Sequence, residues 1–423
     1  GLTGFIPARQ GPGGSVTSSP GGGLGFFNST RRAVSGKFTV YEFFGETLVP
    51  VLKDLPFAHQ LNVEAAVRYA NYSTAGSATS WKFGGDWSPT PDIRFRGVRS
   101  RAVRAPNVGE LFSPGTEGFV TVDDPCDVDF VSGGTASRAA NCAALGISQP
   151  FESNARTINI RTAFSGNPDL EVEVANTWTV GAVLTPQALP NFSMTVDYYS
   201  IKINGAINSL GTQQVLDSCV DLASTDNVFC QNITRDAAGN LLLVQTRDIN
   251  VSSFTREGID VEARYNLDLG RNGVVTISGV ANRVLTNETI LAPGTIAGGE
   301  VIDTNGQIGD PKWRTRATTA WRNGPFGLST TVNFMSNQVP DITPAQPEDN
   351  RATTGTGGFT LVDLQGQYDI TDGTTLRAGV DNVFDNLPPN LPDTRQGGAG
   401  SFAGAEIFPI TGRFFYVGAR VRF

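Results

Sequence analysis

Side chains that could carry out catalysis are few in this 423-residue chain, and their spacing does not fit a reacting centre. His59 is the only histidine, so neither a serine–histidine–aspartate nor a cysteine–histidine arrangement can form. Adjacent carboxylates such as Asp123 and Asp124 fit solvated loop charges better than a general acid and base. We therefore predict that the chain is not an enzyme and has no catalytic residue, no metal site and no cofactor.

The four cysteines are the second group with definite chemistry, and they lie two by two in separate segments. Four cysteines allow three pairings, of which local disulfides between Cys126 and Cys142 and between Cys219 and Cys230 are the most economical. The alternative is a metal site, but the sequence has no C-x-x-C spacing and only one histidine. Each disulfide should contribute about 3 kcal/mol by restraining a large loop without a core.

The elements that must position these loops are strands in which polar and apolar residues alternate. The alternation is clear at the carboxyl end, where Phe415, Val417 and Val421 share one face and Arg420 and Arg422 the other. An apolar face against lipid and a polar face against a wet lumen are typical of a transmembrane β-barrel. The thirteen predicted strands are residues 36–49, 61–72, 80–87, 93–103, 173–184, 192–203, 255–267, 273–285, 312–321, 326–337, 359–370, 375–384 and 406–423.

Composition supports the same class of protein. Glycine at 49 residues, phenylalanine at 26 and only 17% charged residues indicate a chain rich in strands and turns. No apolar run approaches the roughly 20 residues of a spanning helix, which leaves a barrel as the way to cross a membrane. The net charge of -8 argues against a nucleic-acid partner.

Connections between the predicted strands alternate in length when they are counted back from Phe423. Bacterial barrels have short periplasmic turns and long extracellular loops, so the alternation assigns a side to every connection. Both cysteine-bearing loops, residues 104–172 and 204–254, fall outside the cell, where disulfides persist. Single-chain barrels normally have an even number of strands, so we expect one further strand near residues 22–30.

Several segments resemble TonB-dependent outer-membrane receptors. Residues 104–112, R-A-P-N-V-G-E-L-F, are similar to the signature R-A-P-N-x-x-E-L-F of that family. Residues 166–173, 258–261 and 381–385 match later family segments, and Phe423 matches the terminal residue by which assembly machinery recognises such barrels. The ordered set covers nearly the whole chain, which makes the resemblance specific.

The resemblance implies a plug domain, preceded by a TonB box, inside a barrel of about 22 strands. Neither a plug nor a TonB box is found in this sequence, which supplies only about 13–14 strands. We therefore predict an all-β, partial barrel domain over residues 1–423, the carboxy-terminal part of a transmembrane antiparallel β-barrel with long extracellular loops and short periplasmic turns. The functional molecule is expected to contain an upstream segment, because a cut barrel has unpaired strand edges in lipid.

The function implied by the resemblance is TonB-energised uptake of a scarce nutrient across the bacterial outer membrane. The nutrient would be a metal chelate, a vitamin or an oligosaccharide. The implied partners are outer-membrane lipid, the TonB complex acting through the plug, and the small-molecule cargo. One alternative is a passive or ligand-gated porin without a plug, and a soluble β-sandwich binding or adhesion protein is a third.

The candidate site residues fall into four groups. Loop anchoring, rather than substrate contact, is the expected role of the signature residues Arg104, Pro106, Asn107, Glu110, Leu111 and Phe112. The predicted lumen-facing row is Arg94, Arg96, Asp260, Glu262, Arg264, Lys312, Arg314 and Arg316. An aromatic girdle at the membrane interface is predicted from Trp81, Trp87, Trp313, Trp321 and Tyr416. Exposed loop residues that could contact substrate are Phe119, Phe130, Phe151, Asn227, Phe229 and Phe402.

Overall fold

One antiparallel sheet makes up most of the molecule, a computed structural model that describes residues 25–26, 29–30, 33–290, 301–339, 355–389 and 408–422. Thirteen long strands form this sheet, and each overlaps a segment in which the alternating pattern predicts a strand. Their bounds are β3 (Val40–Leu55), β4 (Ala58–Tyr72), β5 (Gly76–Thr90), β6 (Ile93–Arg104), β9 (Glu173–Leu184), β10 (Phe192–Ser209), β12 (Leu241–Asp268), β13 (Val274–Ile290), β15 (Trp313–Asn323), β16 (Phe326–Met335), β17 (Phe359–Thr371), β18 (Thr374–Asp381) and β19 (Phe414–Val421).

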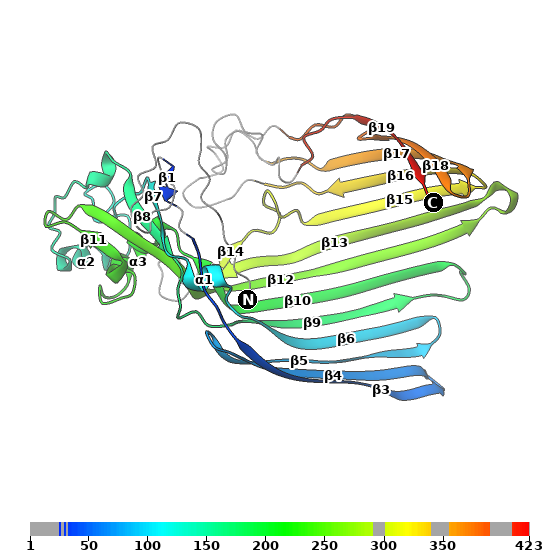
Figure 1. The fold of residues 1–423 in the computed structure, drawn as a ribbon, viewed down its shortest axis with the longest axis horizontal. Coiled ribbons are helices and arrows are strands. Elements are labelled where there is room, and N and C mark those ends of the chain that lie inside the picture. The colour runs from blue at the N-terminus through cyan, green and yellow to red at the C-terminus, as the bar shows by residue number, and fades with distance from the viewer. Residues whose placement is uncertain are drawn as a thin grey trace.

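Each long strand pairs with the next long strand along the chain. Where shorter strands intervene, the long strands still pair directly, as β6 does with β9, β10 with β12 and β13 with β15. Within the described residues β3 pairs only with β4, and β19 pairs only with β18 (Figure 1). The wall formed by these strands is therefore an open sheet with two free edges.

The two faces of this wall differ in chemistry, because side chains alternate along every strand. Exposed apolar side chains on one face include Val67, Phe83, Phe95, Val180 and Val417. On the other face, directly opposed residues of neighbouring strands form the polar row Asn62, Asp86, Arg96, Gly181, Asp197, Asp260, Asn282 and Arg314. One face is suited to lipid and the other to water, as in a transmembrane barrel.

Short turns lie at one end of the wall and long connections at the other, as the sequence predicts. The short turns are residues 56–57, 91–92, 185–191, 269–273, 324–325 and 372–373. Gly324 has a φ of +53°, the left-handed conformation that such a two-residue hairpin turn requires. The connection at residues 73–75 is short although it lies on the side of the long loops.

Two long connections fold together with the first part of β12 into a unit that we call the outer module (residues 113–165 and 210–250). It lies at the end of the wall opposite the short turns (Figure 1). Its elements are β7 (Thr116–Val120), α2 (Arg138–Ala144), β8 (Ile160–Ser165), α3 (Thr212–Asp221) and β11 (Ile233–Arg235). The 28-residue strand β12 runs from the module into the wall, pairing in the module with β8 and β11. No helix among the described residues is long and apolar enough to cross a membrane.

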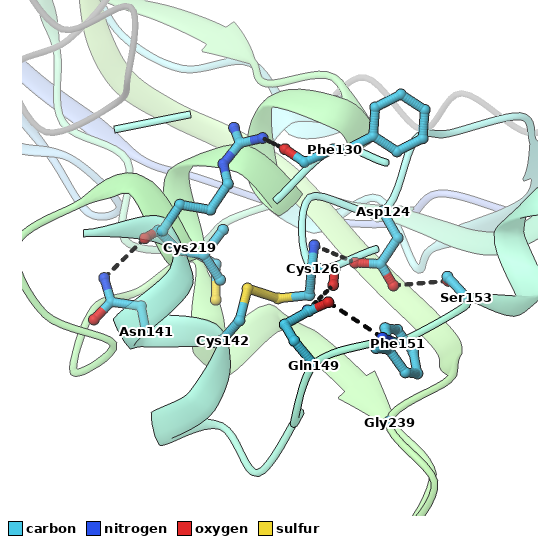
Figure 2. The surroundings of a disulfide bond; sticks show 12 residues. Asp124, Cys126, Phe130, Asn141, Cys142, Gln149, Phe151, Ser153, Cys219 and Gly239 are labelled. Atoms are coloured by element: carbon cyan, nitrogen blue, oxygen red, sulfur yellow. Dashed lines mark hydrogen bonds between the residues drawn. A yellow bond between two sulfur atoms is a disulfide. The ribbon is translucent and has the colours of Figure 1, made fainter. Parts of the chain in front are cut away.

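Both predicted disulfides are formed in the outer module. The Cα–Cα distance is 5.6 Å for Cys126–Cys142 and 4.6 Å for Cys219–Cys230. Figure 2 shows the first of these bonds beside Gln149, whose side-chain amide donates to the Cys126 carbonyl oxygen at 2.7 Å. Three of the cysteines are buried in an apolar core that includes Ile147, Val215, Leu216 and Val244, and the partly buried Cys230 packs against it. The expectation that these loops have no core is therefore wrong.

Strand boundaries differ from the prediction mainly near the outer module. Strand β12 begins at Leu241 rather than residue 255, and β10 continues to Ser209, because the two strands keep pairing beyond a bulge between Ile203 and Ala206. At the amino end there is no further wall strand among the described residues. Instead β1 (Gly25–Phe26) and β2 (Ser29–Thr30) form a small hairpin that pairs with β7.

Candidate functional site

The signature segment lies where β6 leaves the wall and the chain enters the outer module. Arg104 ends β6 and donates to both carboxylate oxygens of Glu173, the residue opposite it on β9, at 2.5 and 2.8 Å. Its Nη1 also donates to Glu110 at 3.0 Å. The Glu173 carboxylate in turn accepts from the backbone N–H of Ile207 on β10 at 2.8 Å. A single guanidinium and its two carboxylates thus join three wall strands to the first turn of the loop.

The helix that follows, α1 (Val108–Phe112), is held by a reciprocal cap. The Asn107 side-chain oxygen accepts from the Glu110 N–H at 3.0 Å, while the Glu110 carboxylate accepts from the Asn107 N–H at 2.7 Å. Pro106 and Leu111 are buried. The Phe112 ring packs on the backbone of Gly36, where an added Cβ would lie 2.2 Å from the ring.

The second family-like segment, residues 166–173, packs on the end of α1. The backbone N–H of Gly166 donates to the Ser113 oxygen at 3.0 Å, and that of Asn167 donates to the Glu110 oxygen at 2.7 Å. A Cβ at Gly166 would lie 2.6 Å from the Ser113 nitrogen, so the two backbones can approach only at a glycine. The Asn167 amide donates to the Asp248 oxygen of β12 at 2.9 Å. Two segments far apart in sequence thus form one hydrogen-bonded junction.

Three fully buried carboxylates in the outer module are bound by arginines. The pairs are Asp124–Arg235, Asp127–Arg156 and Asp221–Arg138. The interpretation of Asp124 as a solvated loop charge is therefore wrong: it accepts from Arg235 at 2.6 and 2.8 Å, and from the Ser153 hydroxyl and the Cys126 N–H (Figure 2). Loss of either partner would leave an uncompensated buried charge.

The pKa values of Asp127 and Asp217 in the module are shifted in opposite directions. Hydrogen bonds from Arg156, at 2.5 and 2.6 Å, lower the pKa of Asp127 to about 2, and the N–H groups of Asp129 and Ser153 act in the same direction. Burial raises the pKa of Asp217 despite its contacts with Gln213 and Arg138. The pairing of Asp127 with Arg156 therefore favours the ionised form of this carboxylate in the folded module.

The aromatic residues predicted to contact substrate lie in different environments. Phe119 on β7 is 55% exposed and Phe130 is 36% exposed, so both are accessible on the outer module. Phe151 is half-buried and packs against Gly239, whose added Cβ would lie 3.2 Å from the ring. Phe229 is only 8% exposed, and the prediction of an exposed aromatic is wrong there because its ring belongs to the core around the disulfides.

The side-chain amide of Asn227 forms all its hydrogen bonds within its own loop. Its amide nitrogen donates to the Cys219 and Ser224 oxygens at 3.0 and 2.7 Å, and its oxygen accepts from the N–H groups of Phe229 and Cys230 at 2.9 Å each. This saturated amide holds the second disulfide in place and leaves little capacity for a ligand. The remaining predicted residues Phe402 and Phe423 lie outside the described residues.

The polar face of the wall holds a hollow of about 800 Å³ between β6 and β17. Of the predicted lumen-facing row, Arg96, Asp260, Glu262, Arg314 and Arg316 line it. Arg96 is paired with Asp197 on β10, its Nε and Nη2 donating at 2.8 and 2.5 Å. Glu262 on β12 and Arg316 on β15 both lie opposite Val280 of the intervening strand β13. Neither forms an ion pair with any residue that the structure describes. The hollow thus offers charges of both signs.

Glycines on the polar face allow a side chain to cross one strand and reach the next. Asp197 on β10 lies over Gly181 of β9, where an added Cβ would be 2.0 Å from its Oδ1, and binds Arg96 on the far strand β6. We call this arrangement a glycine crossing. It links strands that are not neighbours, and it cannot be predicted from the sequence because the strand register is not readable there.

Two aromatic residues make further glycine crossings. Tyr199 lies over Gly258 and its hydroxyl accepts from the Asn282 amide at 3.2 Å. Tyr416 lies over Gly379 and its hydroxyl accepts from the Gln365 amide at 2.8 Å. Tyr416 therefore belongs to the polar face, and its assignment to an interfacial girdle is wrong. Trp87 and Trp321 do lie at the turn end, where their indole N–H groups donate to the carbonyl oxygens of Phe57 and Asn272.

The sequence matches, over residues 5–383, the family described as TonB dependent receptor-like, beta-barrel. The chain belongs to the TonB-dependent receptor family. Members are β-barrels of the bacterial outer membrane and are transporters, not enzymes, which agrees with the predicted location and with the prediction of no catalytic role. The polar face of the wall is accordingly the lumenal face, and the apolar face is the one turned to lipid.

Solved receptors share this fold. The ferric enterobactin receptor PfeA of Pseudomonas aeruginosa is 15% identical with a TM-score of 0.59, and the match covers 93% of this chain and 46% of the receptor. The siderophore receptor PirA of Acinetobacter baumannii is 14% identical, with a TM-score of 0.57 and coverage of 91% and 46%. The FrpB iron transporter of Neisseria meningitidis is 14% identical, with a TM-score of 0.51 and coverage of 91% and 45%. No curated protein sequence matches the chain.

The chain therefore spans less than half the length of these receptors, and at such identities the likeness shows the fold alone. Family membership confirms the predicted transmembrane antiparallel barrel. The extent of the domain, the roles of the signature residues and the substrate-contacting residues stay predictions.

Proposed function

We propose that this chain is the carboxy-terminal part of the barrel of a receptor for TonB-energised nutrient uptake, with a metal chelate as the leading cargo. Membership of the TonB-dependent receptor family is the observation that carries the proposal. The structural neighbours include a ferric enterobactin receptor, a siderophore receptor and an iron transporter, which favour a chelate over a vitamin or an oligosaccharide. An upstream segment of a longer protein would supply the remaining strands and the plug through which TonB acts.

The outer module is suited to a first encounter with cargo. It is fixed to the wall by the continuous strand β12 and by the Arg104 junction, and its own core and disulfides keep it in shape. Phe119 and Phe130 are accessible on its surface and are the residues we assign to cargo contact. The lumenal hollow, with charges of both signs, would then face the plug or passing cargo.

Uptake measurements on the complete gene in its host test this function. Deletion should abolish growth on one class of ferric chelate under iron limitation, and uptake should stop when TonB is removed or the proton gradient is dissipated. Uptake that persists without TonB would contradict the proposal and favour a passive or ligand-gated porin. Uptake of a vitamin or an oligosaccharide would contradict the proposed cargo and support the proposed TonB-dependent transport.

Variants of the outer module test the proposed contact residues. Phe119→Ala and Phe130→Ala should raise the cargo concentration needed for half-maximal uptake without lowering the amount of receptor in the membrane. Leu145→Ala is the matched control, since Leu145 is an exposed apolar residue of the same module, 39% accessible, that we do not assign to contact. An equal effect of all three variants would argue against a specific contact.

A further inference from the structure

The lumenal side chain of Arg377 extends across the last strand of the wall without meeting a partner. Arg377 on β18 is directly opposed to Gly418 on β19. A Cβ at Gly418 would lie 3.1 Å from the Arg377 Nε and 3.5 Å from its Cγ, so the side chain passes over this glycine. Beyond β19 lies the free edge of the sheet, and Arg377 makes no hydrogen bond or ion pair with any described residue.

In three places inside the wall, a side chain that passes over a glycine binds a partner on the far strand. The three glycine crossings described above are Asp197 over Gly181 to Arg96, Tyr199 over Gly258 to Asn282, and Tyr416 over Gly379 to Gln365. Gln367 also lies over Gly327, but Arg322 opposite on the far strand binds Asp369 and not Gln367. Arg377 over Gly418 is therefore an incomplete crossing whose far strand is not among the described residues.

The chemistry of the missing partner follows from the charges around Arg377. Ion pairs between wall strands join an arginine or lysine to a carboxylate on a nearby strand, as Arg68–Glu42, Lys82–Glu64, Arg96–Asp197, Arg104–Glu173 and Arg322–Asp369 do. Arg377 shares a hollow of about 420 Å³ with three further arginines. The Asp369 carboxylate in this hollow already binds Arg322 and Thr375. Asp372, in the turn between β17 and β18, also lines the hollow, but no ion pair joins it to Arg377. Arg377 thus lies among arginines without a bonded counter-charge.

We propose that the strand pairing with the free edge of β19 carries an aspartate or glutamate opposite Gly418, and that Arg377 binds its carboxylate. The strand belongs to the upstream segment of the longer receptor, so this inference rests on the proposed function. Strand β3 is not this partner in the structure, because it forms the opposite edge of the sheet (Figure 1). The unpaired backbone groups of β19 require a partner strand in lipid, and the ion pair fixes its register.

Charge reversal in the full-length receptor tests the proposal. Arg377→Glu should lower the fraction of receptor that runs as a folded, heat-modifiable band by about fivefold or more, because two carboxylates would then face each other. Replacing the predicted acidic residue of the partner strand by arginine should restore the folded band. Arg94→Glu is the control: Arg94 is a lumenal arginine of β6, but both neighbours of β6 lie within this chain, and we expect less than a twofold change.

Disulfide cross-linking identifies the partner strand independently. Val417 on β19 is 84% exposed on the lipid face, so Val417→Cys can form a disulfide with a cysteine placed on the neighbouring strand without disturbing Arg377. This measurement keeps the proposal testable even if Arg377→Glu does not fold.

The outcomes distinguish a failure of this proposal from a failure of the proposed function. An upstream strand cross-linked to Val417→Cys, with an acidic residue opposite Gly418 and rescue by charge exchange, supports the proposal. An upstream strand with another residue at that position, or a folded Arg377→Glu variant without rescue, overturns it and leaves the proposed function intact. Cross-linking of β19 to β3 or to a second copy overturns both, because the barrel would then close without an upstream segment.

Discussion

Replacing Gly181 by alanine should disrupt the glycine crossing between Arg96 and Asp197. The added methyl group would lie 2.0 Å from the Asp197 Oδ1 and 2.7 Å from the backbone oxygen of Val196. The carboxylate can rotate away and give up its pair with Arg96. The backbone oxygen can move only if β10 shifts relative to β9. The substitution therefore removes an ion pair and also strains the spacing of two wall strands.

The strain should dominate the loss in free energy of unfolding. Overpacking against a backbone costs roughly 1–3 kcal/mol. The ion pair contributes only about 0–1 kcal/mol, because the side chains of Arg96 and Asp197 are 42% and 22% exposed in the open wall. We therefore expect Gly181→Ala to destabilise the receptor by about 1–4 kcal/mol and Asp197→Ala by about 1 kcal/mol or less.

Urea titration of the full-length receptor in detergent micelles, read by gel mobility, measures these differences. The double variant Gly181→Ala with Asp197→Ala should lose less than the sum of the single variants, because the clash with the carboxylate is gone. Gly366→Ala is the control, since a Cβ at Gly366 of β17 makes only an ordinary contact of 3.6 Å with Leu328. The reasoning is refuted if Gly181→Ala is within about 0.5 kcal/mol of this control, or if the two single effects simply add.

Three further predictions concern the outer module and its junction. Cys126→Ser with Cys142→Ser should destabilise the module by about 3 kcal/mol, seen as faster proteolysis within residues 113–165 while the barrel stays folded; equal cleavage rates would contradict this. Because the pKa of Asp127 is lowered to about 2, its pairing with Arg156 stabilises the module fully above about pH 4 and is lost as the pH falls towards 2. Asp127→Asn should flatten the acid limb of a protease-sensitivity profile, and an unchanged limb would argue against this pair as its source. Glu173→Gln should weaken the junction by about 1–3 kcal/mol and speed hydrogen exchange at the Ile207 N–H, and unchanged exchange would contradict the role assigned to Glu173.

The wall could be predicted from sequence because two solvents impose a local pattern on it. Lipid on one side and water on the other force a period of two, and this pattern placed all thirteen long strands. The prediction failed where that constraint ends. The first residues of β12, from Leu241, are held by β8 and β11 inside the outer module, so they follow the packing of a small core rather than the alternation of a membrane strand.

The environment of a loop residue depended on contacts that sequence spacing does not reveal. Asp124 is buried because it meets Arg235, 111 residues further along the chain, and Phe229 is buried because the second disulfide folds its loop onto the core. The cysteine pairs were predictable since each pair lies within one loop. The buried carboxylates were not, because a charged residue in a loop is solvated unless a distant partner folds onto it.

The glycines of the wall show what information the strand register adds to the sequence. Gly181 and Gly366 both interrupt predicted strands, and the alternation of the sequence shows only that they lie on different faces. Register places Gly181 on the lumenal face between Arg96 and Asp197, two side chains that need its missing Cβ. Gly366 has only Leu328 in ordinary contact and can take a methyl group. At Gly181 and Gly379 the polar partner lies directly opposite the glycine, whereas at Gly258 the partner Asn282 lies two residues along β13 from the opposing Val284. A lumenal glycine with polar residues opposite on both neighbouring strands is therefore a candidate crossing, and at Gly418, where one neighbour is missing, the first two cases suggest which residue that neighbour carries.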